Sequence, residues 1–160
     1  MQHRLITQND FEALFNLYMD ESANAYLTYD PMSTAEFNVL FNELLATATV
    51  YVVEWNNEVV ATYRLVNNRY RQSHIVYIGS FAVKNNMKGK GIGTNILRFI
   101  QQKAIANGKK RIELTVAINN NVAIQLYQKN GFEIEGTLKK NYSLSSTGEY
   151  YDEYLMSLIL

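Results

Sequence analysis

The chain has 160 residues, of which 48% are hydrophobic and 19% are charged, and its formal net charge at pH 7 is zero. This composition is ordinary for a soluble globular protein, and the length favours a single domain over residues 1–160 with a sizeable core. There is no cysteine, and His3 and His74 are the only histidines. Thiolate catalysis, disulfides and cysteine-ligated metals are therefore excluded, and we expect no metal cofactor.

The N-terminal residues do not show the pattern of a secretion signal, because no basic segment precedes an apolar stretch. No apolar run approaches the roughly 20 residues that a membrane-spanning helix needs. We therefore expect a cytoplasmic location and no membrane partner.

Hydrophobic periodicity in the first half predicts two helices that follow a first strand, HRLIT. Asn9 or Asp10 is placed to cap a helix that runs to about residue 21. Ser33 or Thr34, with Glu36 completing a capping box, predicts a second helix to about residue 46. The segments TVYVVEW and VVATYRLV then predict a hairpin, and HIVYIGSFAV predicts a third consecutive strand.

The second half predicts two further helices and three strands. Apolar residues at helical spacing predict an amphipathic helix over 92–105, which Asn107 and Gly108 end. RIELTVA predicts a buried strand, VAIQLYQKN a helix, and FEIEGTLKKNYSL with YDEYLMSLIL two long antiparallel strands. We also expect the apolar terminal segment YLMSLIL to form an exposed edge that could pair in a homodimer.

The complete order, β-α-α-β-β-β-α-β-α-β-β, indicates an α+β fold with a mixed central sheet of about seven strands and about four helices. The two strand–helix–strand passages after Ile75 favour central strands that are locally parallel or that splay open.

The charges are distributed unevenly along the chain. Residues 1–58 contain nine acidic residues and one basic residue, whereas residues 59–112 contain eleven basic residues and no acidic one. Eight of these eleven lie between Lys84 and Arg111. Clustered positive charge favours a polyanion site. The alternative is a solvated helix face that pairs with acids from elsewhere in the chain.

The segment NNMKGKGIGTNIL, residues 85–97, joins a predicted strand to a predicted helix. It is not a nucleotide P-loop, because G-x-x-x-x-G-K-[ST] is absent, and it closes one residue too early for the dinucleotide fingerprint G-x-G-x-x-G. Successive N–H groups at a helix start can bind phosphate, and glycines allow its close approach. A phosphate or pyrophosphate site is one interpretation, and a tight turn without a ligand is the other.

Two motifs in this chain resemble the acetyl-CoA-binding motifs of the GNAT (Gcn5-related N-acetyltransferase) superfamily. The pyrophosphate loop of that family reads [QR]-x-x-G-x-[GA], and KGKGIG, residues 88–93, matches it with lysine at the first position. The second motif, N-x-x-A-x-x-L-Y-x-x-x-G-F, is matched by NNVAIQLYQKNGF, residues 120–132. The C-terminal part resembles the bacterial branch that contains amino-acid, ribosomal-protein and polyamine acetyltransferases.

The resemblance implies a GNAT-type fold in which strands 75–83 and 111–117 splay apart around the pantetheine of acetyl-CoA. Tyr127 would be the general acid that protonates the departing thiolate, and its alternative is a core tyrosine. The residues implied for cofactor binding are Phe81, Ala82, Val83, Lys88, Gly89, Lys90, Gly91, Ile92, Gly93, Thr94 and Asn120. Asn120 is equally well placed to cap a helix.

The function implied is direct transfer of an acetyl group from acetyl-CoA to a primary amine, such as an amino acid, a polyamine or a protein N-terminus. The acidic first third suits a cationic acceptor. An amino acid would also need a cation for its carboxylate, and Arg64, Arg69 or Arg71 could serve.

The sequence leaves the general base open between His74, Glu54, Glu113 and a chain of waters. Two other functions are also open: a non-catalytic acyl-CoA-binding sensor or regulatory module, and a nucleic-acid-binding module that uses the basic segment. Tyr127 favours the enzyme, and because no nucleic-acid motif is found we expect no nucleic-acid partner.

Overall fold

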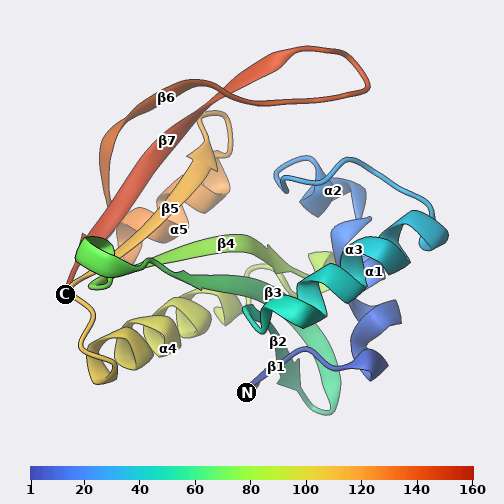
Figure 1. Ribbon diagram of the computed structural model, residues 1–160, viewed down its shortest axis with the longest axis horizontal. Helices are drawn as coiled ribbons and strands as arrows, with labels where there is room; N and C mark the ends of the chain where they lie inside the picture. Colours follow the sequence, from blue (N-terminus) through green and yellow to red (C-terminus); the bar gives the residue numbers. More distant parts are fainter. The chain divides into compact units, whose positions relative to one another are not determined.

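The structure is a computed structural model that describes residues 1–160, with five α-helices, three short 3₁₀ helices and seven strands (Figure 1). The strands form a sheet in the order β1-β2-β3-β4-β5-β7-β6. The β4–β5 pair is parallel and the other described pairs are antiparallel, so the predicted mixed seven-stranded sheet is confirmed. None of the helices has the length and apolar composition that a membrane span requires.

The chain divides into two compact units, each made of two segments. The first contains Met1–Leu65 and Ser80–Lys88, and the second contains Val66–Gly79 and Gly89–Leu160. Strand β4, Ile75–Val83, begins in the second unit and ends in the first.

The first unit packs its helices on one face of the strands β2 and β3, through a core that is rich in aromatic rings. Its elements are β1 (Gln2–Leu5), α1 (Phe11–Tyr18), α2 (Glu21–Asn24), α3 (Thr34–Thr47), β2 (Val50–Trp55) and β3 (Glu58–Asn67). The rings of Phe37 and Tyr18 lie 5.8 Å apart, and both residues are completely buried beside Val50 and Val52. The hairpin is confirmed, and both turn residues, Asn56 and Asn57, have positive φ as a type I′ turn requires.

The helix expected to run to residue 21 ends earlier, at Tyr18. Asp20 is extended, and its side chain accepts hydrogen bonds from the N–H groups of Ser22 and Ala23, so it starts the separate short helix α2. The fold therefore has five α-helices instead of about four. The capping box of α3 is confirmed, because Ser33 and Glu36 bond to each other's backbone N–H groups.

The second unit contains the parallel strands and the helices that follow them. Its elements after β4 are α4 (Ile92–Ala106), β5 (Arg111–Ala117), α5 (Asn121–Lys129), β6 (Glu133–Ser143) and β7 (Tyr150–Ile159). The parallel pairing runs from Ile75↔Arg111 to Ile78↔Leu114 and ends there, although β5 continues to Ala117. The parallel ladder is therefore four residue pairs long.

The expectation that the terminal strand forms a sheet edge is wrong. Strand β7 pairs with β5 on one side and with β6 on the other, in the long hairpin drawn in orange and red in Figure 1. The edge strand at this end of the sheet is β6, and most of its side chains are exposed. The apolar residues of the terminal segment are explained by pairing inside the sheet.

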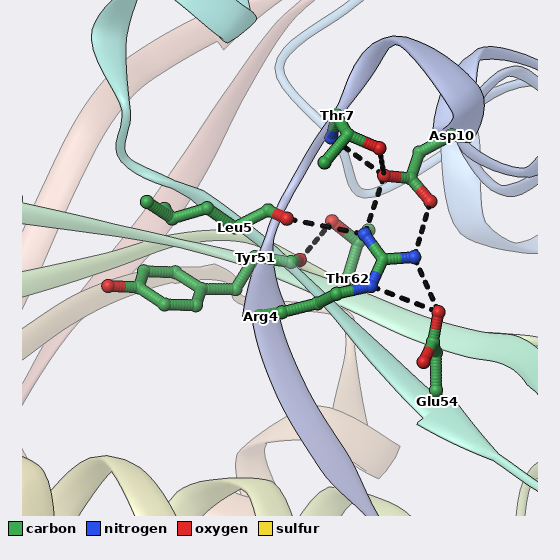
Figure 2. Close-up of polar contacts among 7 residues, drawn as sticks. All are labelled: Arg4, Leu5, Thr7, Asp10, Tyr51, Glu54 and Thr62. Carbon is green, nitrogen blue, oxygen red and sulfur yellow. Dashed lines mark hydrogen bonds and ion pairs between the residues drawn. The ribbon is translucent and has the colours of Figure 1, made fainter.

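A polar cluster fixes the start of the first unit. The sequence predicts that Asn9 or Asp10 caps α1, but the carboxylate of Asp10 makes no capping bond to this helix. It accepts hydrogen bonds from both Nη atoms of Arg4 at 2.7 and 2.8 Å and from the N–H of Thr7 at 2.7 Å. The guanidinium of Arg4 also binds Glu54 on β2 (Figure 2). Asp10 is only 3% exposed, so β1, β2 and the turn before α1 depend on this pair of carboxylates around one cation.

We expect Asp10→Asn to lower the free energy of unfolding by about 3 kcal/mol, because removing one partner of a buried ion pair leaves the other uncompensated. Burial opposes ionisation of Asp10, but the bonds from Arg4 and Thr7 outweigh it and lower its pKa. The difference in the free energy of unfolding between the wild type and Asp10→Asn should thus be complete above the ordinary pKa of aspartate. It should disappear as the pH falls through the lowered pKa of Asp10 in the folded protein.

Urea unfolding of both proteins at several pH values measures this difference. Glu12→Gln, which removes an exposed acid from the same region, serves as the control and should change stability by less than about 0.5 kcal/mol. Equal losses in the two variants would contradict the structural role of Asp10.

Candidate active site

The loop before α4 presents backbone N–H groups at a helix start. After β4 the chain makes a 3₁₀ turn at Asn85–Met87, and α4 begins at Ile92. The first helical bond runs from the N–H of Asn95 to the carbonyl of Gly91 at 3.0 Å. The preceding N–H groups, of Ile92, Gly93 and Thr94, lie in the first turn, where a helix offers them no acceptor. Together with the helix dipole they can bind an anion.

The three glycines of the loop serve two different purposes. Gly89 and Gly91 have φ of +76° and +77°, and an added Cβ would meet nothing within 4 Å at either. Both glycines adopt the left-handed backbone conformation, and the space next to their Cα atoms is open. An added Cβ at Gly93, by contrast, would lie 2.9 Å from Cδ2 of Leu126 on α5. Gly93 therefore allows α4 and α5 to pack closely, a role that the motif alone did not reveal.

The basic segment is only partly neutralised by acids. Lys84 pairs with Glu58 at 2.6 Å, and Arg111 pairs with Glu113 and Glu135. Lys88, from the loop, donates from Nζ to the hydroxyl of Ser22 at 2.9 Å, close to the carboxylate of Asp20. A separate group of basic residues forms no ion pair: Arg98, Lys109 and Lys110.

Tyr127 lies on α5, only 6% exposed, with its ring centroid 5.8 Å from that of Phe132. Burial, and then the nearby Tyr77, raise the pKa of Tyr127 well above the ordinary value of a phenol. A phenol is neutral at physiological pH even at its ordinary pKa, and the raised pKa makes Tyr127 a weaker proton donor than a free phenol. Asn120 is the N-cap of the same helix, and its side-chain oxygen accepts from the N–H of Ala123 at 3.2 Å.

Tyr77 is a residue near Tyr127 that the sequence analysis missed. Its hydroxyl lies 2.9 Å from the hydroxyl of Thr115 on β5. The alternation of buried and less buried residues along β4 and β5 places both side chains on one face of the sheet, together with Glu113. This alternation was visible in the sequence, but the approach of Tyr77 to α5 was not.

The three side chains considered as general bases differ in their hydrogen-bond partners and exposure. Glu54 binds Arg4 in the polar cluster of the first unit, and Glu113 accepts a hydrogen bond of 2.5 Å from Nε of Arg111. Both carboxylates are thus committed to arginines. His74 is exposed, and its backbone carbonyl accepts from the N–H of Lys110 at 2.9 Å.

The residues expected to contact pantetheine form the end of β4 in the first unit. Ala82 is buried in the core of that unit, whereas Phe81 and Val83 are half-buried. Ser80, directly before them, has φ of +47°, which is uncommon for a residue with a Cβ. The strand therefore changes its backbone direction where these residues begin.

The sequence profile of the Acetyltransferase (GNAT) family matches residues 11–132, and the chain belongs to this family. The chain is 41% identical over 95 residues to the L-amino acid N-acetyltransferase AaaT of Escherichia coli, a stretch that covers 59% of this chain and 57% of that protein. This chain is thus matched over little more than half the length of that relative.

Solved structures share the fold over the whole chain. Spermidine N-acetyltransferase of Vibrio cholerae, in complex with CoA and spermine, superposes with a TM-score of 0.82 at 23% identity, covering 99% of this chain and 94% of that one. Ribosomal-protein-alanine N-acetyltransferase of Brucella melitensis superposes with a TM-score of 0.78 at 23% identity, covering 100% of both chains. These likenesses confirm the predicted GNAT-type fold.

We expect Asn120→Ala to lower the free energy of unfolding by about 1 kcal/mol, because the N–H of Ala123 loses its cap. Asn120→Ser should retain most of this stability, since serine is also a good N-cap. Urea unfolding measures both, and Asn119→Ala, an exposed neighbour, is the control. Equal losses for the alanine and serine variants at position 120 would show that the cap is not what Asn120 contributes.

Proposed function

We propose that the chain is an acetyl-CoA-dependent N-acetyltransferase that moves an acetyl group directly to a primary amine. The observation that carries this proposal is the glycine loop, which leads with open left-handed glycines into the first turn of α4 in a member of the GNAT family. The CoA and spermine named for the Vibrio cholerae structure support both the cofactor and the class of acceptor. The relative that acts on L-amino acids supports a second acceptor class.

The pyrophosphate of acetyl-CoA is proposed to bind the loop from Lys88 to Thr94, mainly through backbone N–H groups. The residues Phe81, Ala82 and Val83 are proposed to bind pantetheine through their backbone. Asn120 uses one lone pair of its side-chain oxygen as a helix cap, so its amide nitrogen and the second lone pair would be left for the cofactor. The acid-free stretch 59–112 supplies positive charge suited to a polyanion.

The chemistry needs little covalent help from the protein. The neutral amine attacks the thioester carbonyl, the carbon–sulfur bond breaks, and the thiolate takes a proton from a general acid. The attacking nitrogen then loses one proton, which restores the acid, and the products are an amide and a thiol. Tyr127 is proposed as this acid, because it occupies the tyrosine position of the motif at residues 120–132 and a phenol is protonated at physiological pH. The acceptor must lose a proton before attack. Since Glu54 and Glu113 are bound to arginines, His74 and water are the remaining candidates for the base.

The alternative function, a non-catalytic acyl-CoA sensor, differs only in the absence of turnover. A cytoplasmic location and a homodimer are further proposals, and sedimentation of the purified protein would measure the oligomeric state. The tyrosine at position 127, which the motif resemblance assigns to the general acid, favours the enzyme over the sensor.

Calorimetric titration with acetyl-CoA, followed by a thiol-release assay with amino acids, polyamines, aminoglycosides and N-terminal peptides, tests the proposal. We expect Tyr127→Phe to lower kcat by about 100-fold or more while acetyl-CoA binding is retained, because only the proton donor is lost. Tyr70→Phe changes a tyrosine that is 90% exposed and should have no effect.

Full turnover by Tyr127→Phe would remove Tyr127 from the role of acid. Binding of acetyl-CoA without turnover of any amine would favour the sensor. A wild-type protein that does not bind acetyl-CoA would contradict both functions.

A further inference from the structure

Arg64, on β3, is a half-buried cation without an acidic partner. Its Nε donates to the hydroxyl of Thr49 at 3.0 Å, and no carboxylate of the chain forms an ion pair with it. Arg4 and Arg111 each bind two carboxylates instead. Residues 1–58, which supply most of the first unit, contain nine acids, so the isolation of Arg64 is not caused by a shortage of partners.

Tyr18 places an unsatisfied hydroxyl near this cation. The side chain is completely buried, and its hydroxyl is the one buried side-chain polar atom without a hydrogen-bond partner. Ser80, Thr62 and Arg64 lie close enough to influence its pKa, which burial raises to about 12. Neither neighbouring hydroxyl forms a bond of normal geometry with it, and Thr62 donates to the carbonyl of Tyr51 at 2.9 Å instead (Figure 2).

This pair lies close to the start of the proposed cofactor segment, residues 81–83. The N–H of Lys84 donates to the carbonyl of Val60 at 2.8 Å, so β4 runs antiparallel beside β3 within the first unit. Ser80 on β4, like Thr62 and Arg64 on β3, lies near the hydroxyl of Tyr18. Arg64 shares the face of Val50, its partner on β2, which is the face that α1 and α3 cover. Ser80 directly precedes residues 81–83.

We propose that Arg64, with the hydroxyl of Tyr18, binds the carboxylate of an amino-acid acceptor. This inference rests on the proposed acetyltransferase function and narrows its acceptor. The terminal N–H groups of a guanidinium match the two oxygens of a carboxylate, and such charge-assisted bonds are about twice as strong as neutral ones. A hydroxyl that lacks a partner gains its bond outright when a ligand oxygen arrives. A polyamine would meet repulsion at Arg64.

The experiment compares L-amino acids with the matching L-amino acid amides, which keep the amine and lose the carboxylate. We expect the wild type to prefer the acids, and Arg64→Gln to lower kcat/KM for the acids about tenfold or more while that for the amides changes less than about threefold. Arg64→Lys should retain part of the preference for acids, because the ammonium keeps the positive charge but loses the planar guanidinium that can bind both carboxylate oxygens. Lys129→Gln, an exposed loss of the same charge, is the matched control.

The variant Tyr18→Phe tests whether the hydroxyl of Tyr18 contributes to acceptor binding or to the stability of the fold. Since it deletes a hydroxyl without a partner, its Tm should not fall below that of the wild type. Its kcat/KM for the acids should nevertheless fall several-fold, with the amides unaffected. A purely structural Tyr18 would give the opposite pattern, an altered Tm with no change in preference.

Calorimetric binding of the acids to the protein–CoA complex is measured in parallel, so that failure of the inference can be told from failure of the proposed function. Acids that bind, and that Arg64→Gln weakens, would support the carboxylate site even without turnover. The inference would be overturned if the wild type acetylated amides as fast as acids, or if Arg64→Gln lowered kcat/KM equally for both. It would also be overturned if Arg71→Gln, and not Arg64→Gln, removed the preference for acids, or if no acid bound.

Discussion

The parallel ladder between β4 and β5 ends after four residue pairs, at Ile78 and Leu114, and the rest of the proposed site depends on this short ladder. Backbone groups beyond the last pair no longer serve that ladder and can bind other partners. On β4 the chain adopts a positive φ two residues later, at Ser80. The same strand then leads through the glycine loop into α4, so one connection carries both the proposed pantetheine residues and the proposed pyrophosphate residues.

The arginines of the chain differ in whether carboxylates of the chain bind them. Arg4 and Arg111 are each held between two carboxylates, and the cluster around Arg4 joins β1, the turn before α1 and β2. Such groups stabilise the fold and have no spare bonding capacity for a substrate. Arg64 differs because its terminal N–H groups meet no carboxylate, beside a tyrosine hydroxyl with no partner. Unmatched polar groups in a packed interior are costly, and a ligand is one reason to keep them.

Local patterns in the sequence predicted most of the fold. The strands 75–83 and 111–117, the α3 capping box and the asparagine turn depend on neighbouring residues, and all are confirmed. The early end of α1 and the position of β7 inside the sheet could not be predicted in this way. The first follows from the side chain of Asp20, which starts a new helix, and the second depends on which distant strand pairs with which.

Candidate site residues could be proposed where a motif fixes the backbone, but not where distant side chains meet. The loop 88–93 and Tyr127 were singled out because their motifs resemble those of the GNAT superfamily, whereas the packing of Gly93 against Leu126 and the approach of Tyr77 to Tyr127 are contacts between elements. Amide chemical shifts in a ¹⁵N-labelled protein titrated with acetyl-CoA test the central claim most directly. The account predicts the largest changes at Lys88 to Thr94, followed by residues 81–83. Saturable binding that leaves these amides unchanged would contradict it.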